Sequence, residues 1–263
     1  MLVDGKTIAA GVLKQVAEDV SSIGRPLRLS IITCAPNFET QKYLDMKKKK
    51  ASSVGVGLNI IELPADISTE EVLNCIKQVI GDSDGIIVQL PLPVQIDRDK
   101  VLAGIPSGKD PDGFKYGQIS DACLSPVVGA IDEISKLHNI EWQGKSVVVM
   151  GEGRLVGMPA AHYAQKKGGV VKVLTKETYS TDVLKLADII ITGIGQPHFI
   201  EADSVKDGVI IFDAGTSEDG GVLVGDVAPQ VASKAKLLTP VPGGIGPITI
   251  AYLLKNLVLL VRQ

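Results

Sequence analysis

The sequence predicts an α/β fold with two domains, in which strands of parallel sheets alternate with helices. Two observations predict it: apolar runs of strand length alternate with helix-period segments over residues 7–89, and the same alternation starts again near Gly144. Strands separated by helices are joined by crossovers, which implies parallel pairing. A chain of 263 residues is long enough for one or two domains.

The first half contains three helix signals and three strand signals. Apolar residues recur at helical spacing in the first helix, and Gly55 ends the second. Ser68 with Glu71 three residues later forms a capping-box pattern at the start of the third. In chain order the predicted elements are a helix over 7–20, a strand over 27–32, a helix over 41–54, a strand over 57–62, a helix over 68–80 and a strand over 85–89.

The second half has the element order of a doubly wound dinucleotide-binding domain. Between the halves, over residues 117–143, strand and helix signals thin out, so the domain boundary is expected there. The predicted elements are a strand over 145–150, a helix over 160–167, a strand over 170–174, a third strand at the end of 184–192 and a fourth over 208–213.

Composition excludes several classes of function. The net charge of −3 and an aromatic content of 4% argue against a polyanionic partner and against single-stranded nucleic-acid binding. Cys34, Cys75 and Cys123 are widely spaced, which indicates neither a metal cluster nor a disulfide framework. We therefore expect a reducing, cytoplasmic setting.

Membrane insertion is not expected either. The first six residues carry charge and lack the apolar core of a signal peptide. The run 248–261 is apolar but is interrupted by Thr249, Lys255 and Asn256, so we interpret it as a docking helix and not as a membrane span.

Three separate segments carry residue types that could build one polar pocket. Tyr43 and Lys47 are four residues apart and would share one face of a helix. Gln89 follows a buried-type strand and precedes two prolines, and 109–114 (K-D-P-D-G-F) places carboxylates on a turn. The alternative for Lys47 is a solvated cation in the lysine run 47–50.

A glycine-rich loop follows the strand that ends at residue 150. Its spacing, G-x-G-x-x-x-G over Gly151, Gly153 and Gly157, is one residue longer than the usual dinucleotide fingerprint. Such glycines allow a tight turn and close approach of a pyrophosphate to a helix N-terminus. The alternative is an ordinary strand-to-helix turn. Turns at 193–197 and 213–216 would lie around the same crevice.

A loop rich in proline and glycine, over residues 239–249, precedes the final apolar segment. Its many special backbone positions indicate a ligand-facing role, although a purely structural loop is the alternative.

Together these motifs resemble the bifunctional methylenetetrahydrofolate dehydrogenase/methenyltetrahydrofolate cyclohydrolase family, and the resemblance covers essentially the whole chain. The matching motifs are D-G-K at 4–6, Y-x-x-x-K at 43–47, Q-L-P-L-P at 89–93, K-D-x-D-G-F at 109–114, G-x-G-x-x-V-G-x-P at 151–159, G-D-V at 225–227 and T-P-V-P-G-G-x-G-P-x-T at 239–249.

The resemblance implies a fold and an activity. Residues 1–117, with the final helix over about 247–263, would form a folate-binding catalytic domain. Residues 118–246 would form a Rossmann-like NAD(P)-binding domain across a cleft. The expected reactions are oxidation of methylenetetrahydrofolate with NADP, or NAD, and hydrolysis of the product to formyltetrahydrofolate. The resemblance further implies a homodimer.

It also implies roles for individual residues. Tyr43 would stack on the folate, Lys47 would be the catalytic amine, Gln89 would position Lys47, and Asp112 would bind the pterin. Leu90, Pro91, Pro242 and Gly243 would line the folate side. The cofactor-binding residues would be Gly151, Glu152, Gly153, Arg154, Gly157, Lys176, Ile194 and Thr216.

Departures from the family pattern cluster on the cofactor side. Glu152 and Gly153 stand where the family has the Arg and Ser of G-R-S, which help to bind the 2′-phosphate of NADP. Glu152 would repel that phosphate, whereas Lys176, after the next strand, could supply a cation. The segments 124–128 and 213–217 also depart. A preference shifted toward NAD is therefore one hypothesis; the alternatives are a monofunctional cyclohydrolase and a non-catalytic interaction protein.

Overall fold

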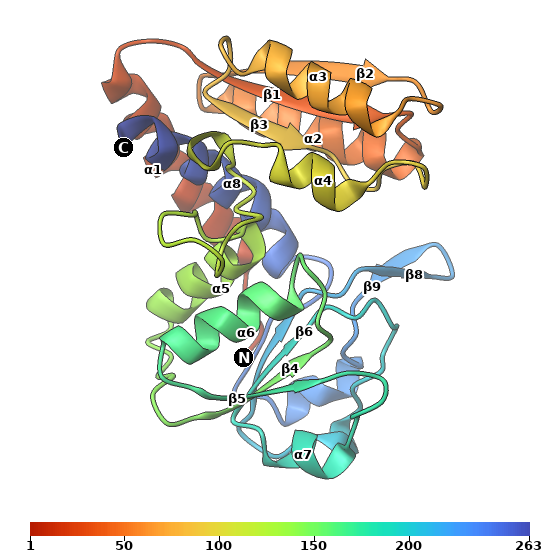
Figure 1. The fold of residues 1–263 in the computed structure, drawn as a ribbon. Helices are drawn as coiled ribbons and strands as arrows, with labels where there is room; N and C mark the ends of the chain where they lie inside the picture. Colours follow the sequence, from red (N-terminus) through yellow and green to blue (C-terminus); the bar gives the residue numbers. More distant parts are fainter. The chain divides into compact units, whose positions relative to one another are not determined.

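The chain forms two compact units (Figure 1). The computed structural model describes residues 1–263, apart from the side chain of Glu39. The N-terminal unit contains residues 10–123 and 250–263, and the C-terminal unit contains residues 1–9 and 124–249. The division expected from the sequence lay at 117/118 and near 246/247, with residues 1–9 in the first domain.

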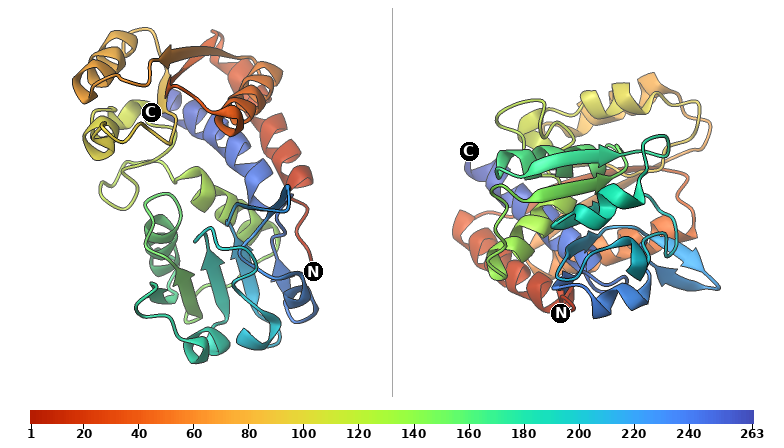
Figure 2. Two further views of the ribbon diagram at one scale, coloured as in Figure 1. Left: turned by 90° about the vertical axis from the view of Figure 1, so that its right-hand side faces the viewer. Right: turned by 90° about the horizontal axis from the view of Figure 1, so that it is seen from below.

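The N-terminal unit is a parallel sheet in the order β2-β1-β3 with helices on both faces. Figures 1 and 2 show α2 and α3 on opposite sides of it. Its elements are β1 (Leu27–Cys34), α2 (Phe38–Ser53), β2 (Val56–Leu63), α3 (Thr69–Val79), β3 (Gly85–Val88), α4 (Arg98–Ala103) and a 3₁₀ turn (Ser107–Lys109), together with most of α1 (Gly5–Ile23) and α8 (Ile245–Arg262).

The predicted capping box is confirmed at the start of α3. Ser68 Oγ accepts a hydrogen bond from the Glu71 N–H at 3.3 Å, and the Glu71 carboxylate accepts one from the Ser68 N–H at 2.9 Å. These bonds satisfy backbone donors that the first helical turn leaves without partners. Because α3 starts where the sequence predicts, its apolar stripe, which includes Val72 and Ile76, is buried on the sheet.

Helix α8 packs as the expected docking helix within the N-terminal unit. It is long and apolar enough to cross a membrane by length and composition, but 67% of its span is buried inside the protein. Asn256 Nδ2 donates to the Pro111 carbonyl at 2.8 Å, and Arg262 forms an ion pair with Asp19 of α1 at 2.9 Å. Asn256, a polar interruption in the sequence, therefore fixes the turn that carries Asp112.

The C-terminal unit is a parallel sheet in the order β10-β7-β6-β4-β5. Its elements are α5 (Pro126–Leu137), β4 (Ser146–Met150), α6 (Gly157–Lys166), β5 (Val170–Leu174), α7 (Thr181–Leu186), β6 (Ile189–Thr192), a 3₁₀ turn (Ala202–Ser204), β7 (Ile210–Asp213), the hairpin β8 (Ser217–Asp219) and β9 (Val222–Val224), a second 3₁₀ turn (Pro229–Ser233) and β10 (Leu237–Leu238).

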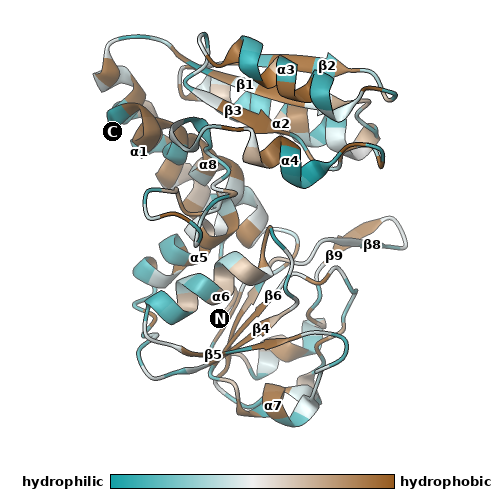
Figure 3. Cartoon of the chain, in the orientation of Figure 1, coloured by the Kyte–Doolittle hydropathy of each residue, from teal (hydrophilic) through white to brown (hydrophobic). Residues whose placement is uncertain are grey.

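Apolar residues of the strands pack against helices and turns on both faces of this sheet. Val148, Ile190 and Ile211 pack against Leu184 and Val231 on one face, and α5 and α6 cover the other (Figure 1). Figure 3 shows the apolar residues gathered along β3, β4 and β6.

The segment 117–143, where strand and helix signals thin out in the sequence, contains the division between the two units at 123/124, and helix α5 follows that division. Ser125 caps α5 by accepting a hydrogen bond from the Val128 N–H, and Pro126 occupies the first helical position. Proline is favoured at that position because its missing N–H needs no partner there.

Strand order places a topological switch point between β4 and β6. After β4 the chain crosses through α6 to β5 on one side, and then through α7 to β6 on the other. The register pairs Met150 with both Leu174 and Thr192, and Thr192 with Asp213, so four carboxyl ends meet at one edge. Ligands of open α/β sheets bind outside such an edge, at the switch point.

Candidate active site

Lys47 lies on α2 with its amine in a buried polar cluster of the N-terminal unit. The side chain is only 6% exposed, and its Nζ donates to Gln89 Oε1 at 3.0 Å. The Gln89 amide is oriented by its own bond from Nε2 to the Leu90 carbonyl at 2.7 Å. The Tyr43 ring, one turn earlier on α2, lies with its centroid 4.9 Å from Nζ. The structure therefore brings Lys47, Gln89 and Tyr43 together.

Asp112 is coupled electrostatically to the same amine. Burial lowers the pKa of Lys47, and the charge of Asp112 opposes that shift. Burial likewise raises the pKa of Asp112, and Lys47 opposes that one. An amine that loses its proton more readily than a solvated lysine can act as a base nearer neutrality. The alternative of a solvated Lys47 is wrong, whereas Lys48, Lys49 and Lys50 are exposed.

Asp110 holds the turn that carries Asp112, a role that the sequence analysis did not assign. Its two carboxylate oxygens accept hydrogen bonds from the N–H groups of Gly113 and Phe114, at 3.0 and 2.9 Å. Burial, with the adjacent charge of Asp112, raises the pKa of Asp110 to about 7. The signal was present, since Asp110 is the first Asp of K-D-x-D-G-F.

The Asp110 pKa predicts a pH dependence of stability. An unfolded Asp titrates near pH 4, so between about pH 4 and 7 the folded state retains a proton that the unfolded state has lost. The contribution of Asp110 to stability is therefore fully present below pH 4 and is lost as the pH rises through 7. Asp110→Asn cannot ionise, so its unfolding free energy should rise relative to wild type by about 2–3 kcal/mol between pH 5 and 8.

Urea unfolding of both proteins at the two pH values measures this difference. Asp99→Asn, at an exposed position on α4, is the matched control and should show the same pH dependence as wild type. An identical pH dependence of wild type and Asp110→Asn would contradict the assignment.

The glycine-rich turn lies at the carboxyl edge of the C-terminal unit's sheet. Gly151 has φ +84° and donates its N–H to the Leu174 carbonyl at 2.7 Å. Gly157 begins α6, where a Cβ would lie 2.1 Å from the Gly151 carbonyl oxygen. At Gly153 a Cβ would meet no atom within 4 Å, so this position is open. The turn thus needs Gly151 and Gly157 for its own geometry.

Other predicted cofactor residues occupy the same edge. A Cβ on Gly151 would lie 3.1 Å from the Ile194 side chain, so the loops after β4 and β6 are in contact. Lys176 follows β5 and Thr216 follows β7, and both are exposed. Glu152 and Arg154 are exposed on the glycine-rich turn. The sheet therefore gathers these residues, and the predicted cleft to the folate side stays a prediction.

The loop before α8 contains Pro242 and Gly243 and belongs to the C-terminal unit. Gly5 donates its N–H to the Gly243 carbonyl at 2.9 Å, and a Cβ on Gly5 would lie 1.8 Å from the Gly244 carbonyl oxygen. Close packing thus explains the glycines at 5 and 244. Pro242 is exposed, and a Cβ on Gly243 would meet no atom within 4 Å, so these two positions face open space.

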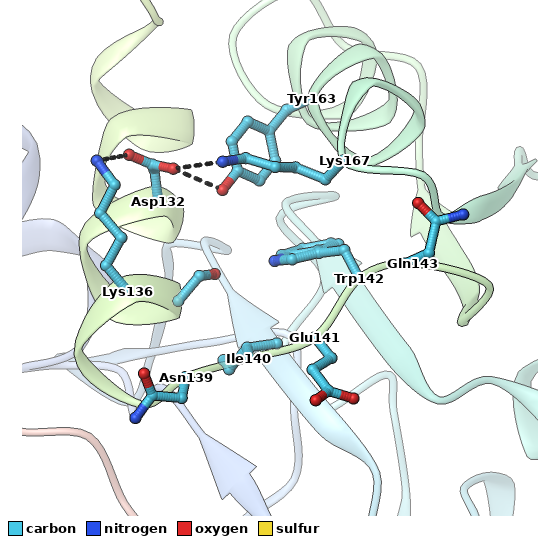
Figure 4. A pocket seen from close by; sticks show the side chains of 10 residues that line it. Asp132, Lys136, Asn139, Ile140, Glu141, Trp142, Gln143, Tyr163 and Lys167 are labelled. Atoms are coloured by element: carbon cyan, nitrogen blue, oxygen red, sulfur yellow. Dashed lines mark hydrogen bonds and ion pairs between the residues drawn. The ribbon is translucent and has the colours of Figure 1, made fainter.

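A hollow of about 520 Å³ lies elsewhere in this unit, beside α5 and the end of α6 (Figure 4). The Asp132 carboxylate in it accepts from Tyr163 Oη at 2.8 Å and pairs with Lys136 at 2.6 Å and Lys167 at 3.3 Å. Its lining residue Trp142 precedes β4, whereas the glycine-rich turn follows β4. Both lysines that line the hollow therefore pair with the same carboxylate. Within the described residues, no three His, Cys, Asp or Glu side chains are grouped to hold a metal ion.

Family models match both parts of the chain. Residues 3–112 match the tetrahydrofolate dehydrogenase/cyclohydrolase catalytic domain, and residues 126–263 match the NAD(P)-binding domain of the same family. The bifunctional protein FolD of Mycoplasmopsis synoviae is 33% identical, with 98% of each chain covered.

Solved structures agree with this match. The bifunctional FolD methylenetetrahydrofolate dehydrogenase/cyclohydrolase of Campylobacter jejuni aligns with a TM-score of 0.95 at 32% identity, covering 100% of this chain and 98% of the other. FolD of Trypanosoma brucei, solved with NADP and an inhibitor, aligns with a TM-score of 0.93 at 31% identity, covering 100% and 97%. With a buried lysine cluster in one unit and a glycine-rich sheet edge in the other, the chain belongs to the tetrahydrofolate dehydrogenase/cyclohydrolase family.

Proposed function

We propose that this protein oxidises methylenetetrahydrofolate to methenyltetrahydrofolate with NADP, and then hydrolyses the product to formyltetrahydrofolate in one-carbon metabolism. The observation that carries the proposal is the buried Lys47 amine, hydrogen-bonded to Gln89 and coupled to Asp112. Matches to both domains of the family support two activities over a monofunctional cyclohydrolase or a non-catalytic interaction protein.

The Lys47 cluster provides the proton transfer that hydrolysis needs. Attack of water on the methenyl carbon of the substrate forms a C–O bond as the C=N⁺ π electrons move onto nitrogen, and the attacking water loses a proton. Collapse of this adduct then breaks one C–N bond, the departing nitrogen takes the hydroxyl proton, and the formyl group remains on the other nitrogen. The neutral Lys47 amine can take the proton that the attacking water loses, and burial makes the neutral form more accessible. Gln89 Oε1 then accepts a bond from the amine and fixes its direction. Asp112 offers acceptor oxygens to the donor-rich edge of a pterin.

The sheet edge of the C-terminal unit fits a dinucleotide. The turn at Gly151–Gly157 opens α6, which has no side-chain cap. Pro159 has no N–H and the Met158 N–H donates to the Gly153 carbonyl, so the Gly157 N–H and the positive end of the helix dipole are what this terminus offers a pyrophosphate. Ile194 borders the same turn, and Lys176 is an exposed cation after β5. When bound there, NADP supplies the hydride acceptor for the oxidation.

A single assay tests the proposal. Purified protein is mixed with methylenetetrahydrofolate and NADP or NAD, and the reduced nicotinamide and the methenyl chromophore are followed together. Decay of added methenyltetrahydrofolate is measured separately. We expect reduction of the dinucleotide and accelerated decay. Decay of methenyltetrahydrofolate without reduction of either dinucleotide would overturn only the proposed dehydrogenase activity. The absence of both activities would overturn the whole proposal.

Glu152 and Lys176 are expected to act in opposite directions on the choice of dinucleotide. Glu152→Gln removes a carboxylate that repels a 2′-phosphate and should raise the ratio of kcat/KM for NADP to that for NAD. Lys176→Met removes a cation and should lower that ratio, by about threefold to tenfold for an exposed charge. Lys172→Met, on an exposed position of β5, is the control. Ratios that match the control in both variants would exclude these side chains from 2′-phosphate recognition.

Two further properties are proposed from the resemblance and the composition. Widely spaced free cysteines support a reducing, cytoplasmic setting. The family assignment supports a homodimer. Light scattering on the purified protein tests the dimer; a monomer mass of 27.7 kDa at micromolar concentration would overturn it.

A further inference from the structure

Asp226 is a buried carboxylate beneath the predicted cofactor edge, and the function described so far leaves it without a role. Its side chain is fully buried, with 0% exposure. One oxygen accepts from Thr192 Oγ1 at 2.7 Å and from the Ile194 N–H at 2.8 Å. The other accepts from the Gln196 N–H at 2.8 Å. Asp226 thus fixes the first part of the loop that follows β6, from Thr192 to Gln196.

Asp213, at the end of β7, does the same for the neighbouring segments. One oxygen accepts from the N–H groups of Gly215 and Asp226, at 2.9 and 3.2 Å, and the other from the Val227 N–H at 3.0 Å. The loops after β6 and β7 and the segment 225–227 are therefore held together by two carboxylates.

Two glycines make this arrangement possible. A Cβ on Gly215 would lie 2.3 Å from the Asp226 carboxylate, and one on Gly225 would lie 2.1 Å from the Asp213 carboxylate. Each carboxylate packs directly on the glycine beside the other. The segment 213–217 departs from the family pattern, but all four of these residues are present in the chain, so the support beneath the edge is intact.

Burying two carboxylates costs desolvation free energy, which a loop held only by apolar packing would not incur. Burial, together with the charge of the neighbouring Asp226, raises the pKa of Asp213 to about 6. Apolar packing would stabilise such a loop more cheaply. What the carboxylates provide instead is direction, since each oxygen fixes the position of a backbone N–H.

We propose that Asp226, together with Asp213, is a positioning residue that preorganises the Ile194 loop to receive the nicotinamide dinucleotide. The inference rests on the proposed dehydrogenase activity and deepens it. Its loop lies against the glycine-rich turn through Ile194 and Gly151. The bonds are made by groups of the C-terminal unit alone, so they can hold this loop in place before a dinucleotide binds.

The test is Asp226→Asn, because this substitution keeps the shape of the side chain but replaces one acceptor oxygen with a donor NH₂ group. In either orientation of the amide, an NH₂ group faces the backbone N–H of Ile194 or of Gln196. We expect KM for NADP to rise about tenfold or more. Decay of methenyltetrahydrofolate, which depends on Lys47 and Gln89 in the other unit, should change less than about twofold.

Two other variants keep the test decisive. Thr192→Val removes only the hydroxyl donor to Asp226 and should raise KM for NADP by about threefold. Asp203→Asn, at an exposed position of the same unit, should leave both activities unchanged. An unchanged KM in Asp226→Asn and Thr192→Val, or equal loss of both activities with a lowered Tm, would overturn the inference. A wild type that binds no dinucleotide would overturn the proposed dehydrogenase as well, so the two failures are distinguishable.

Discussion

Lys47→Met should lower the rate of methenyltetrahydrofolate hydrolysis by at least ~100-fold while the protein stays folded. The amine is the buried group that can accept the proton released from water, and general base catalysis contributes ~10²- to 10⁴-fold. Met has an unbranched side chain of similar length, and removing a buried amine removes its desolvation cost. We therefore expect little change in Tm.

The oxidation should fall less than the hydrolysis in this variant. Hydride transfer from the methylene bridge moves no proton to Lys47, so only orientation of the substrate depends on the amine. Loss of the cation also raises the pKa of Asp112 further, because Lys47 opposes the effect of burial on that carboxyl. Weakened pterin binding should then appear as a higher KM for methylenetetrahydrofolate in both reactions.

Lys48→Met is the matched control for this experiment. Lys48 is the next residue on α2 and is exposed, so the same substitution changes charge and helix composition without touching the cluster. We expect wild-type rates. Equal rates of hydrolysis in the two variants, measured by the decay of the methenyl absorbance, would show that Lys47 is not the base.

Local patterns in the sequence predict much of this cluster. The four-residue spacing of Tyr43 and Lys47 places both on one face of a helix, and the structure confirms it with the amine over the Tyr43 ring. The bond from Lys47 to Gln89, 42 residues later, was expected only from the family resemblance. Spacing predicts neighbours within an element, but not which elements meet.

The supporting carboxylates show what the sequence could not predict. Asp110 and Asp226 are buried, and although both lie in motifs of the sequence, neither motif shows that the carboxylate bonds to the backbone of a loop. Most of their partners are backbone N–H groups, which every residue except proline carries and which no sequence pattern distinguishes. Asp226 was visible only as part of a G-D-V motif, and its bonds to Ile194 and Gln196 span about 30 residues of chain. The sequence therefore predicts the candidate site residues better than it predicts the buried carboxylates that hold the neighbouring loops in place.

Gly157→Ala should destabilise the C-terminal unit and weaken dinucleotide binding. The added Cβ would lie 2.1 Å from the Gly151 carbonyl oxygen and 3.1 Å from the Glu152 Cα, both of them backbone atoms. The glycine-rich turn or α6 must then move, at a cost of about 1–3 kcal/mol for an overpacked contact. Alanine is the better helix former, so propensity alone would change stability in the opposite direction. Thermal unfolding and KM for NADP should both show the loss, with hydrolysis unaffected at temperatures where the protein is folded.

Gly153→Ala, in the same turn, separates the two roles that glycine can have there. No atom lies within 4 Å of its Cβ position, so Tm should equal that of wild type. If a pyrophosphate approaches the backbone at Gly153, KM for NADP should still rise, because only the bound dinucleotide would meet the new methyl group. A lowered Tm in Gly153→Ala, or an unchanged one in Gly157→Ala, would contradict the division of this loop into a structural glycine and a ligand-facing one.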